Sequence, residues 1–571
     1  MERISREVER GRNFCLHAPT GFGKTPVVLA AILPLGFPVI WVTRTGNQAD
    51  RPVEELKVIN ERSGADFLGL SFRGKRDMCP VARERRGVDY EALKVLCRKC
   101  RLNRKLNEVP METMTFSEIY ALGKRAGVCP YRIQLEMAKH VDLISMSYNY
   151  VFSDLIFMIE KFFRLRNAIL VVDEAHNLQK IVGELNSEKL TRNSIARAAK
   201  EAKEFGTERS MKLSRKIRAL AEYVKTLRNE STFAAAELLK KLGIGEEELR
   251  YGVYIGAKIY EMQLEAGKPL RSYVRRFSRF WQKALELEGV DGVALLQSGE
   301  GFEIFDMRAA EILQEIWKKF HACIFMSGTL KPVEAFAETV GLGDYIKAEV
   351  PSFASNVHAF IVRGVSTRGE ELTDVQREKY RFLIHGFFSY PGNVAVFTSS
   401  YRVQEELMEF FVEASKERGK ELFVENENLR GTEARRMLED FRQSENAALI
   451  GPCGGRFAEG ADFPGRALEA IMVIGIPFDR VTLKTQLYIQ YYTRLYGEKG
   501  RYYAYVVPAL RRASQALGRA IRSPQDFGFF VLADERYFRR EYFELLPDYI
   551  QRNVRGVHYS NFPLLMQHFF Q

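Results

Sequence analysis

The sequence HAPTGFGKT, from His17 to Thr25, follows a short apolar run and leads into the apolar, helix-favouring stretch TPVVLAAIL. Gly21 and Gly23 allow backbone conformations that point N–H groups at phosphate oxygens. Lys24 stands where an ammonium group reaches the β- and γ-phosphates of a nucleotide, and the Thr25 hydroxyl can hold Mg²⁺. A helix that begins here adds its positive N-terminal end. The stretch therefore predicts a strand, a phosphate-binding loop and a helix.

A second motif, VVDEAH, ends another apolar run and extends from Val171 to His176. In this position Asp173 can bind a metal ion and Glu174 can polarise an attacking water molecule. Both carboxylates come at the carboxyl end of a predicted strand, where open α/β sheets bind their ligands. A chance strand–turn–helix would explain GKT alone but not both motifs, so together they predict an ATP site.

A third segment, QALGRAIR, places Arg519 and Arg522 three residues apart. If this segment is helical, the two guanidinium groups share one face and can clamp a γ-phosphate as charge develops. The alternative is a solvated basic helix face, which an isolated RxxR pattern would favour. Because Gln515 and Gly518 accompany the arginines, we favour the functional interpretation. Arginines supplied from so far along the chain imply a second lobe that closes on the phosphates.

Composition sets wider limits. The chain has 571 residues, a net charge of +12 and seven cysteines, a length that suggests roughly three or four domains. The positive charge favours a polyanionic partner, and so few cysteines indicate a reducing, cytoplasmic compartment. The N-terminus lacks an apolar signal core. The apolar stretch 26–42 is interrupted by Pro34, Gly36 and Pro38, so a helix and then a strand are expected there in place of a membrane span.

Strand-like and helix-like runs alternate, which predicts an α/β fold built on parallel sheets covered on both faces. The first series of strands is NFCLHA, PVIWVT, AILVVDEAH and ACIFMSGTL, and the second is NVAVFTSSY, AALIGPCGG, AIMVIGIP and YYAYVVPA. From about Arg73 to Met137 the chain is basic, cysteine-bearing and helix-poor. From about Ser187 to Gly292 it is strongly helical, with one apolar stripe at Leu213, Ile217, Leu220, Val224 and Leu227.

The cysteines of the basic segment follow the pattern C-x17-C-x2-C-x28-C, at Cys79, Cys97, Cys100 and Cys129. The close pair can bind one metal centre, and the outer two can close the loops around it. Spacing alone leaves zinc and a 4Fe–4S cluster equally open. The remaining cysteines lie in or beside strand-like runs, which predicts small buried thiols at Cys15, Cys323 and Cys453.

The motifs occur in the order APTGFGKT, DEAH, SGTL, GGRFAEGADFPG and QALGRAIRS, which resembles superfamily 2 DNA helicases. More narrowly, the chain resembles the iron–sulfur family of XPD-like helicases, to which WVTRTGNQ (41–48) and SYNY (147–150) are also similar; one departure is Ala18, which replaces the usual first glycine of the phosphate loop. The resemblance implies two RecA-like lobes, with an iron–sulfur domain and a helical Arch domain inserted into the first. The implied boundaries are 1–72, 139–186 and 293–345 for lobe 1, 73–138 for the iron–sulfur domain, 187–292 for the Arch and 346–571 for lobe 2.

The same resemblance implies ATP- and Mg²⁺-dependent movement from 5′ to 3′ along single-stranded DNA, in nucleotide excision repair. It implies a monomer that acts on single strands and forked duplexes, with repair proteins as partners and no membrane, associated with the nucleoid of an archaeal cell. GKRDMCP and GVCPY resemble the family's cluster-ligand segments, which favours a 4Fe–4S cluster over zinc. Three alternatives remain: a damage-verification scaffold with a vestigial ATP site, an ATP-dependent nuclease relative, for which we find no nuclease module, and an RNA helicase, which the cysteine insertion disfavours.

Site residues follow from the matched motifs. Catalytic roles are expected for Lys24, Asp173, Glu174, Gln515, Arg519 and Arg522, with Thr25 and Asp173 as Mg²⁺ ligands. Nucleotide contacts are expected at Ala18, Pro19, Thr20, Gly21, Phe22, Gly23, Lys24, Thr25, Glu459, Gly460 and Asp462. Because a motor must grip any sequence, DNA contacts should be to phosphates, at Thr43, Arg44, Thr45, Lys75, Ser327, Thr329, Ser399 and Ser400, with Tyr148 as a further candidate DNA contact.

Aromatic residues near these motifs have two interpretations. Tyr148 and Tyr150 can stack on DNA bases, but aromatic side chains beside a buried strand more often belong to the core, which is the interpretation we favour. In RSYVRRFSRFWQK an apolar stripe at Val274, Phe277 and Trp281 predicts an amphipathic Arch helix with a solvated basic face.

Overall fold

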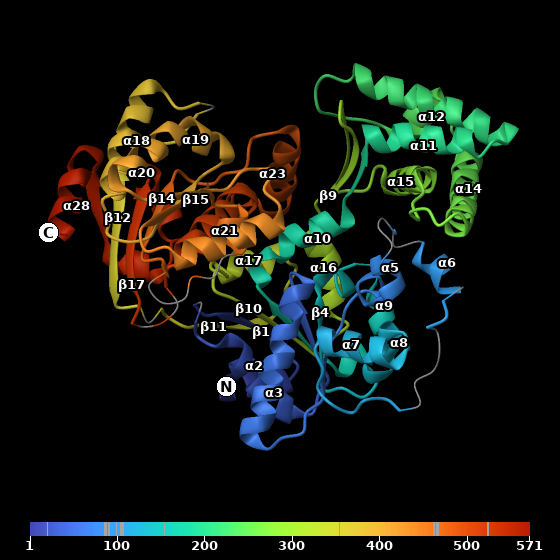
Figure 1. Ribbon diagram of the computed structural model, residues 1–571, viewed down its shortest axis with the longest axis horizontal. Helices are drawn as coiled ribbons and strands as arrows, with labels where there is room; N and C mark the ends of the chain where they lie inside the picture. The colour runs from blue at the N-terminus through green and yellow to red at the C-terminus, as the bar shows by residue number, and fades with distance from the viewer. Residues whose placement is uncertain are drawn as a thin grey trace. The chain divides into compact units, whose positions relative to one another are not determined.

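A computed structural model describes residues 1–19, 21–84, 88, 92–98, 100–102, 108–153, 155–352, 354–369, 371–460, 463, 467–521, 523 and 525–570, with the backbone alone at 459, 460 and 570 (Figure 1). The chain divides into two compact units. Unit 1 comprises Met1–Cys15, Thr25–Met326 and Ala337–Lys347, and unit 2 comprises Leu16–Lys24, Ser327–Phe336 and Ala348–Gln571. Unit 2 therefore contains the phosphate loop and the SGT segment as well as the C-terminal region.

The N-terminal strands form a seven-stranded sheet in the order β11-β1-β10-β5-β2-β4-β3. The strands are β1 (Asn13–His17), β2 (Val39–Thr43), β3 (Gly69–Ser71), β4 (Leu143–Ser147), β5 (Ile169–Asp173), β10 (Ala322–Ser327) and β11 (Tyr345–Glu349). The pairings β10–β5, β5–β2, β2–β4 and β4–β3 are parallel. Central strands β2 and β10 are buried along their whole length, as expected for a sheet covered on both faces. The parallel sheet predicted from the first series of strands is confirmed.

The C-terminal strands form a second seven-stranded sheet in the order β14-β15-β13-β16-β17-β12-β18, parallel throughout. Its strands are β12 (Asn356–Arg363), β13 (Val394–Thr398), β14 (Glu421–Val424), β15 (Ala447–Pro452), β16 (Ala470–Ile474), β17 (Phe527–Ala533) and β18 (Val554–His558). Helices α18 (Asp374–Phe387), α20 (Met408–Arg418) and α28 (Phe562–Phe570) share one apolar core with these strands (Figure 1). This sheet holds the second set of motifs at the ends of its strands.

One strand prediction for this region is wrong. The run YYAYVVPA is helical: a π-helical turn (η7, Tyr502–Val506) continues into α25 (Val507–Leu517). Pro508 lacks the N–H that an α-helical turn would need, so the wider turn before it has a local cause. A short apolar run rich in Tyr and Val fits a buried helix as well as a strand, and its period cannot distinguish the two.

The strongly helical region predicted between the two motif series is confirmed. Its main helices are α11 (Arg192–Glu204), α12 (Glu208–Thr226), α14 (Glu246–Glu265) and α15 (Tyr273–Leu287). The predicted stripe on α12 is buried from Leu213 to Val224, and Val274, Phe277 and Trp281 of α15 are fully buried in the same core. An antiparallel sheet in the order β6-β9-β8-β7, which was not predicted, accompanies the helices. Its strands are β6 (Glu188–Thr191), β7 (Ser231–Thr232), β8 (Val293–Ser298) and β9 (Gly301–Asp306).

The expectation that the cysteine-bearing segment is poor in helix is wrong. It contains α4 (Lys75–Met78), α5 (Pro80–Glu84), α6 (Leu93–Arg98), α7 (Phe116–Ala126) and α8 (Pro130–Met137). Ordinary end signals explain α7, because Glu118 accepts the Thr115 N–H in a capping box and Gly127 ends the helix at a φ of 64°. The segment shares an apolar cluster with Tyr260 and Leu270 of the helical region.

The apolar stretch 26–42 divides as predicted, into α2 (Lys24–Ile32), a single 3-10 turn (Leu33–Leu35) and β2. Across the part of the chain that the structure describes, no helix has both the length and the apolar character that crossing a membrane requires.

Candidate nucleotide and DNA sites

The phosphate loop joins β1 to α2 and has the backbone shape that its glycines predict. Gly21 and Gly23 have φ values of 82° and 78°, in the left-handed region that a side chain disfavours. The ammonium group of Lys24 donates to the carbonyl oxygens of Ala18 and Pro19, at 3.1 Å each. These bonds hold the Lys24 ammonium group against the phosphate loop. A bound phosphate would replace the two carbonyl oxygens as its hydrogen-bond acceptor. Thr20 lies outside the described residues.

The acidic motif follows β5 directly. Glu174 has a φ of 51°, a left-handed conformation that costs a residue with a side chain roughly 1–2 kcal/mol. Its N–H donates to the Asp173 side chain at 2.9 Å, and His176 Nδ1 lies 3.4 Å from its carboxylate. The Asp173 carbonyl oxygen accepts the hydroxyl of fully buried Tyr148. The turn therefore fixes two carboxylates in sequence at the carboxyl end of the strand.

The SGT segment follows β10, the strand that lies between β1 and β5. The Ala18 N–H donates to the Ser327 carbonyl oxygen at 3.2 Å, so the phosphate loop and this segment are hydrogen-bonded within unit 2. The Thr329 hydroxyl is buried and has no hydrogen-bond partner among the residues that the structure describes. The three motifs thus each follow one of three neighbouring strands of this sheet, of which β10 and β5 are parallel.

Two basic residues extend the same segment within unit 2. Arg511 of α25 donates to the Leu330 carbonyl oxygen at 3.0 Å, and burial lowers the pKa of this guanidinium to about 10. Lys331 lies 2.9 Å from Asp548 and 3.2 Å from Glu349. Arg511 was not among the predicted site residues, because no motif in the surrounding sequence indicates that its side chain is buried.

The C-terminal arginine segment differs from its predicted helix. Helix α25 ends at Leu517, and Gly518 and Arg519 lie in the turn that follows. The Arg519 Nε donates to the Ala458 carbonyl oxygen at 2.6 Å, within the short helix α22 (Arg456–Gly460). Gln515 is half-buried on α25. The helical condition for a face shared with Arg522 is therefore not met at Arg519, and Arg522 lies outside the described residues. The role of both arginines at the phosphates stays a prediction.

The motif GGRFAEGADFPG supplies α22. A buried carboxylate that the sequence analysis missed, Glu425, accepts the N–H groups of Arg456 and Phe457 at the start of this helix, at 2.7 and 3.0 Å. The predicted nucleotide contacts Glu459 and Gly460 belong to α22, but only their backbone is described, and Asp462 lies outside the described residues. A polar residue directly after the apolar run LFV was the one available signal for Glu425.

The predicted DNA contacts lie at strand ends of both sheets. Thr43 is buried at the end of β2, and its hydroxyl donates to the Thr45 carbonyl oxygen at 2.9 Å; Thr45 in turn caps a short helix together with Gln48. Ser399 and Ser400 follow β13, and the Ser400 side chain accepts the N–H of Val403. These residues shape their own turns, and their contact with DNA stays a prediction.

The tyrosines near the motifs mostly pack in the hydrophobic core. Tyr148 is fully buried, packs edge-on against Phe152 at 5.3 Å, and has a pKa raised well above the usual value by burial. Its ring is therefore inaccessible to a base in this structure, in line with the interpretation we favoured. Tyr150 is half-buried against Phe72, and the ammonium group of Lys75 lies 5.8 Å from the ring centre of Tyr131.

The four cysteines of the basic segment are free thiols, and the close pair is joined by a hydrogen bond from the Cys100 N–H to the Cys97 carbonyl oxygen at 3.3 Å. Cys79 follows α4, Cys97 lies in α6, and Cys129 precedes α8. Burial, together with the neighbouring thiols of the set, raises the pKa of Cys79 and of Cys129. Among the residues with described positions, no three His, Cys, Asp or Glu side chains are arranged to hold one metal ion. The thiols predicted to be small and buried, Cys15, Cys323 and Cys453, are fully buried.

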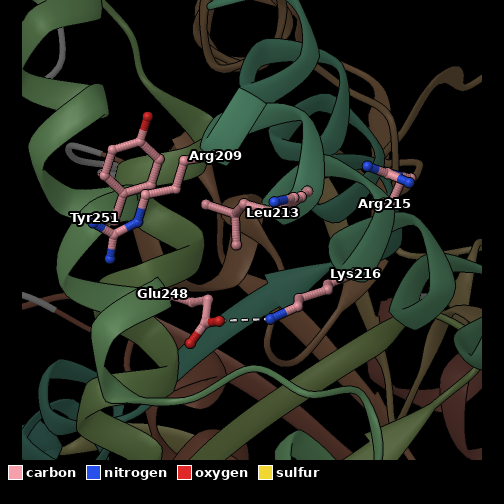
Figure 2. A pocket seen from close by; sticks show the side chains of 7 residues that line it. Arg209, Leu213, Arg215, Lys216, Glu248 and Tyr251 are labelled. Atoms are coloured by element: carbon pink, nitrogen blue, oxygen red, sulfur yellow. Dashed lines mark hydrogen bonds and ion pairs between the residues drawn. The ribbon is translucent and has the colours of Figure 1, made fainter. Parts of the chain in front are cut away.

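A basic hollow of about 390 Å³ lies between α12 and α14 (Figure 2). Three of its four lining cations have acidic partners: Lys216 lies 2.5 Å from Glu248, Lys212 lies 2.6 Å from Glu208, and Arg209 lies 3.7 Å from Glu247 and over the ring of Tyr251. Exposed pairs of this kind contribute about 0–1 kcal/mol. We assign the hollow no ligand, since it has the character of a solvated groove between two helices.

Comparisons with known proteins agree with this geometry. The family model "Helicase C-terminal domain" matches residues 384–553, and the model DEAD_2 matches residues 41–195. The chain is 26% identical over 559 residues to the ATP-dependent DNA helicase XPD of Sulfolobus acidocaldarius, covering 94% of this chain and 95% of the relative. It is 21% identical to the general transcription and DNA repair factor IIH helicase subunit XPD of Arabidopsis thaliana, covering 98% and 90%.

Solved structures show the same fold. A structure of an XPD helicase superposes with a TM-score of 0.73 at 22% identity, covering 97% of this chain and 98% of that one. The two parallel sheets are the RecA-like lobes of a motor protein, and with the matched family models they define an ATP-dependent DNA helicase. Within that class the chain belongs to the XPD-like helicases.

Proposed function

We propose that the protein moves from 5′ to 3′ along single-stranded DNA and separates forked duplexes, driven by hydrolysis of ATP. The observation that carries the proposal is the convergence of three motifs after neighbouring strands. The phosphate loop follows β1, the SGT segment follows β10 and the acidic motif follows β5. A nucleotide bound at Lys24 would therefore lie beside the segment that connects to Arg511.

The proposed hydrolysis step uses charges that already stand in the loops. Lys24 exchanges its bonds to the carbonyl oxygens of Ala18 and Pro19 for the β- and γ-phosphates. Thr25 and Asp173 would hold Mg²⁺, which supplies positive charge at the phosphates when bound. Glu174, held by its strained turn and by His176, orients the attacking water. Arg519 and Arg522 supply the charge that stabilises the transition state.

Coupling of hydrolysis to movement is proposed to run through the SGT segment and α22. The SGT segment bonds the phosphate loop at Ala18, and α22 bonds Arg519 at Ala458. A change of charge at the phosphate loop therefore has a hydrogen-bonded route to residues 327–329, and a shift of Arg519 has one to α22. We propose that residues 327–329 and 399–400 grip the strand. Gripping phosphates gives movement that does not depend on sequence.

We also propose a 4Fe–4S cluster at Cys79, Cys97, Cys100 and Cys129. The four thiols, all among the described residues, are not arranged around one metal ion, and what supports the proposal is the backbone donors at two of them: the Ala82 N–H lies 3.4 Å from the Cys79 sulfur, and backbone N–H groups of residues 131 and 132 favour the Cys129 thiolate. Thiols that raise one another's pKa are the groups that a bound cluster would stabilise as thiolates. When bound, the cluster would supply a cross-link between α4, α6 and α8.

The cellular role is proposed to be nucleotide excision repair, with repair proteins as partners. The names of two relatives support this, since one is an XPD helicase and the other is an XPD subunit of a transcription and DNA repair factor. The net charge of +12 is consistent with work on a polyanion.

Strand displacement on forks of defined polarity tests the proposal. With ATP and Mg²⁺, the protein should displace a strand from a fork with a 5′ single-stranded tail and leave the matching 3′-tailed fork intact. The same preparation should show the broad visible absorption of an iron–sulfur protein. Displacement only from 3′ tails would refute the direction, and colourless protein with stoichiometric zinc would refute the cluster.

A further inference from the structure

Glu425 joins two segments that the motor must coordinate. It follows β14 directly and is 1% exposed. One carboxylate oxygen accepts the Arg456 N–H at 2.7 Å and the Tyr401 hydroxyl at 3.1 Å, and the other accepts the Phe457 N–H at 3.0 Å. All three donors belong to unit 2. A single buried side chain is thus shared by the start of α22 and by the segment that begins at Ser399.

The backbone of Glu425 strengthens the same junction. Its carbonyl oxygen accepts the Gln404 side-chain amide at 2.7 Å, and Gln404 belongs to α19 (Tyr401–Glu406), the helix that Ser400 caps. Its N–H donates to the Ile450 carbonyl oxygen of β15 at 2.8 Å. The side chain and the backbone therefore both tie the strand-end loops of β13, β14 and β15 together.

The geometry requires a carboxylate at this position. Three donors converge on two oxygens, and each oxygen faces a backbone N–H group, which can only donate. In either orientation a glutamine would turn its NH₂ group toward one of these backbone N–H groups, which leaves a buried donor unpaired. Burial, together with the charge of Glu425 and the hydrogen bond to it, raises the pKa of Tyr401 to about 12, so this hydroxyl keeps its proton at neutral pH.

We propose that Glu425 is a positioning residue that transmits strand contact at Ser399–Tyr401 to α22, and so to the turn that holds Arg519. The inference rests on the proposed function, because it assigns strand contact to residues 399–400. Arg519 bonds the Ala458 carbonyl oxygen, one residue beyond Phe457, so a shift of the helix start reaches the arginine directly.

The test compares Glu425→Gln with Glu469→Gln. Glu469 accepts the Tyr390 hydroxyl at 3.0 Å and directly precedes β16, so it forms a similar Tyr–Glu pair at the amino end of a strand, whereas Glu425 lies at the carboxyl end of β14 in the same sheet. The readout is the ratio of ATP turnover with and without single-stranded DNA, measured with thermal unfolding of each variant. Glu425→Gln should lower this ratio about tenfold, and Glu469→Gln should leave it within about twofold of the parent protein.

Tyr401→Phe provides a second, milder variant in case Glu425→Gln does not fold. It should lower the same ratio, and the double variant should lose no more than Glu425→Gln alone, because both changes interrupt one connection. Equal ratios for the Glu425 and Glu469 variants, or additive losses in the double variant, would overturn the inference.

Hydrogen exchange separates failure of this inference from failure of the proposed function. Without any DNA or ATP, Tyr401→Phe should speed exchange of the Arg456 and Phe457 amides, whereas Tyr390→Phe should not. If the parent protein shows no DNA-stimulated turnover, the proposed function fails and this exchange result still tests the junction. Unchanged exchange in Tyr401→Phe would overturn the junction even in an active motor.

Discussion

Replacing Gly455 with alanine tests how tightly α22 is held. A Cβ atom at Gly455 would lie 2.5 Å from one carboxylate oxygen of Glu425 and 2.8 Å from its Cδ and other oxygen. Real Cβ atoms do not lie this close to other heavy atoms, so the Glu425 carboxylate would have to move. Its oxygens are held by two backbone N–H groups and the Tyr401 hydroxyl, and no alternative position keeps all three bonds.

The expected cost follows from those bonds. Hydrogen bonds to a charged group contribute about 1.5–3 kcal/mol each. Losing one of them and weakening a second should destabilise unit 2 by about 2–4 kcal/mol. For a unit of this size, that corresponds to a fall in Tm of about 5–10 °C.

Gly454 offers a matched control one residue away. A Cβ there would first meet Arg512 Cδ at 3.8 Å, an ordinary contact, so Gly454→Ala should shift the Tm by less than about 2 °C. Unfolding of unit 2 should be followed by calorimetry on the full chain. Tryptophan fluorescence would report unit 1 instead, because all three tryptophans (Trp41, Trp281 and Trp317) belong to that unit. Equal Tm values for Gly455→Ala and Gly454→Ala would refute the close approach of Glu425 to the backbone.

Three further changes have expected outcomes. Lys24→Ala should lower DNA-stimulated ATP hydrolysis by a hundredfold or more, on the order expected when a transition-state charge partner is removed, while DNA binding in a filter or anisotropy assay stays within a few-fold. Cys97→Ser should remove the visible absorption and reduce duplex separation more than ATP hydrolysis, because Cys97 lies outside the nucleotide loops; normal unwinding by this variant would contradict the proposed role of the cluster. Burial raises the pKa of Glu201 to about 7, although the Val274 N–H and the Ser272 hydroxyl donate to its carboxylate. The protonated carboxyl group therefore favours the folded state, and the free energy of unfolding should fall as pH rises from about 4.5 to 7, by at most about 3 kcal/mol. Glu201→Gln should remove that loss, and parallel pH profiles of unfolding for the two proteins would contradict it.

The sequence was informative where a motif directly ends an apolar run. The phosphate loop, the acidic motif and the SGT segment each follow a strand that the structure contains, at β1, β5 and β10. In these places the local chemistry of glycine, lysine and carboxylate coincides with the strand end, so local reasoning reaches the correct result. The apolar stripe of α12 was predictable for the same reason, since a helical period needs no knowledge of distant residues.

The errors share a different cause. The run YYAYVVPA forms η7 and the start of α25 in unit 2. The periodicity of so short an apolar run does not distinguish a helix from a strand. Helix α25 ends before Arg519, whose guanidinium bonds Ala458, a partner 61 residues away. The role of Glu425 was not predicted because its donors, Tyr401 and Arg456, lie 24 and 31 residues away along the chain. Each of these features depends on contacts that only the assembled sheet creates.

The central claim is that arginines of the C-terminal half complete an ATP site begun by the phosphate loop. Single-turnover hydrolysis with saturating single-stranded DNA tests it most directly, using Arg519→Ala and, as control, Arg512→Ala, whose parent side chain binds the Pro477 carbonyl oxygen and Asp479 instead. We expect Arg519→Ala to bind a non-hydrolysable ATP analogue normally but to hydrolyse ATP about 10³-fold more slowly. Arg512→Ala should hydrolyse ATP at nearly the parent rate. Hydrolysis by Arg519→Ala at the rate of Arg512→Ala would contradict the claim.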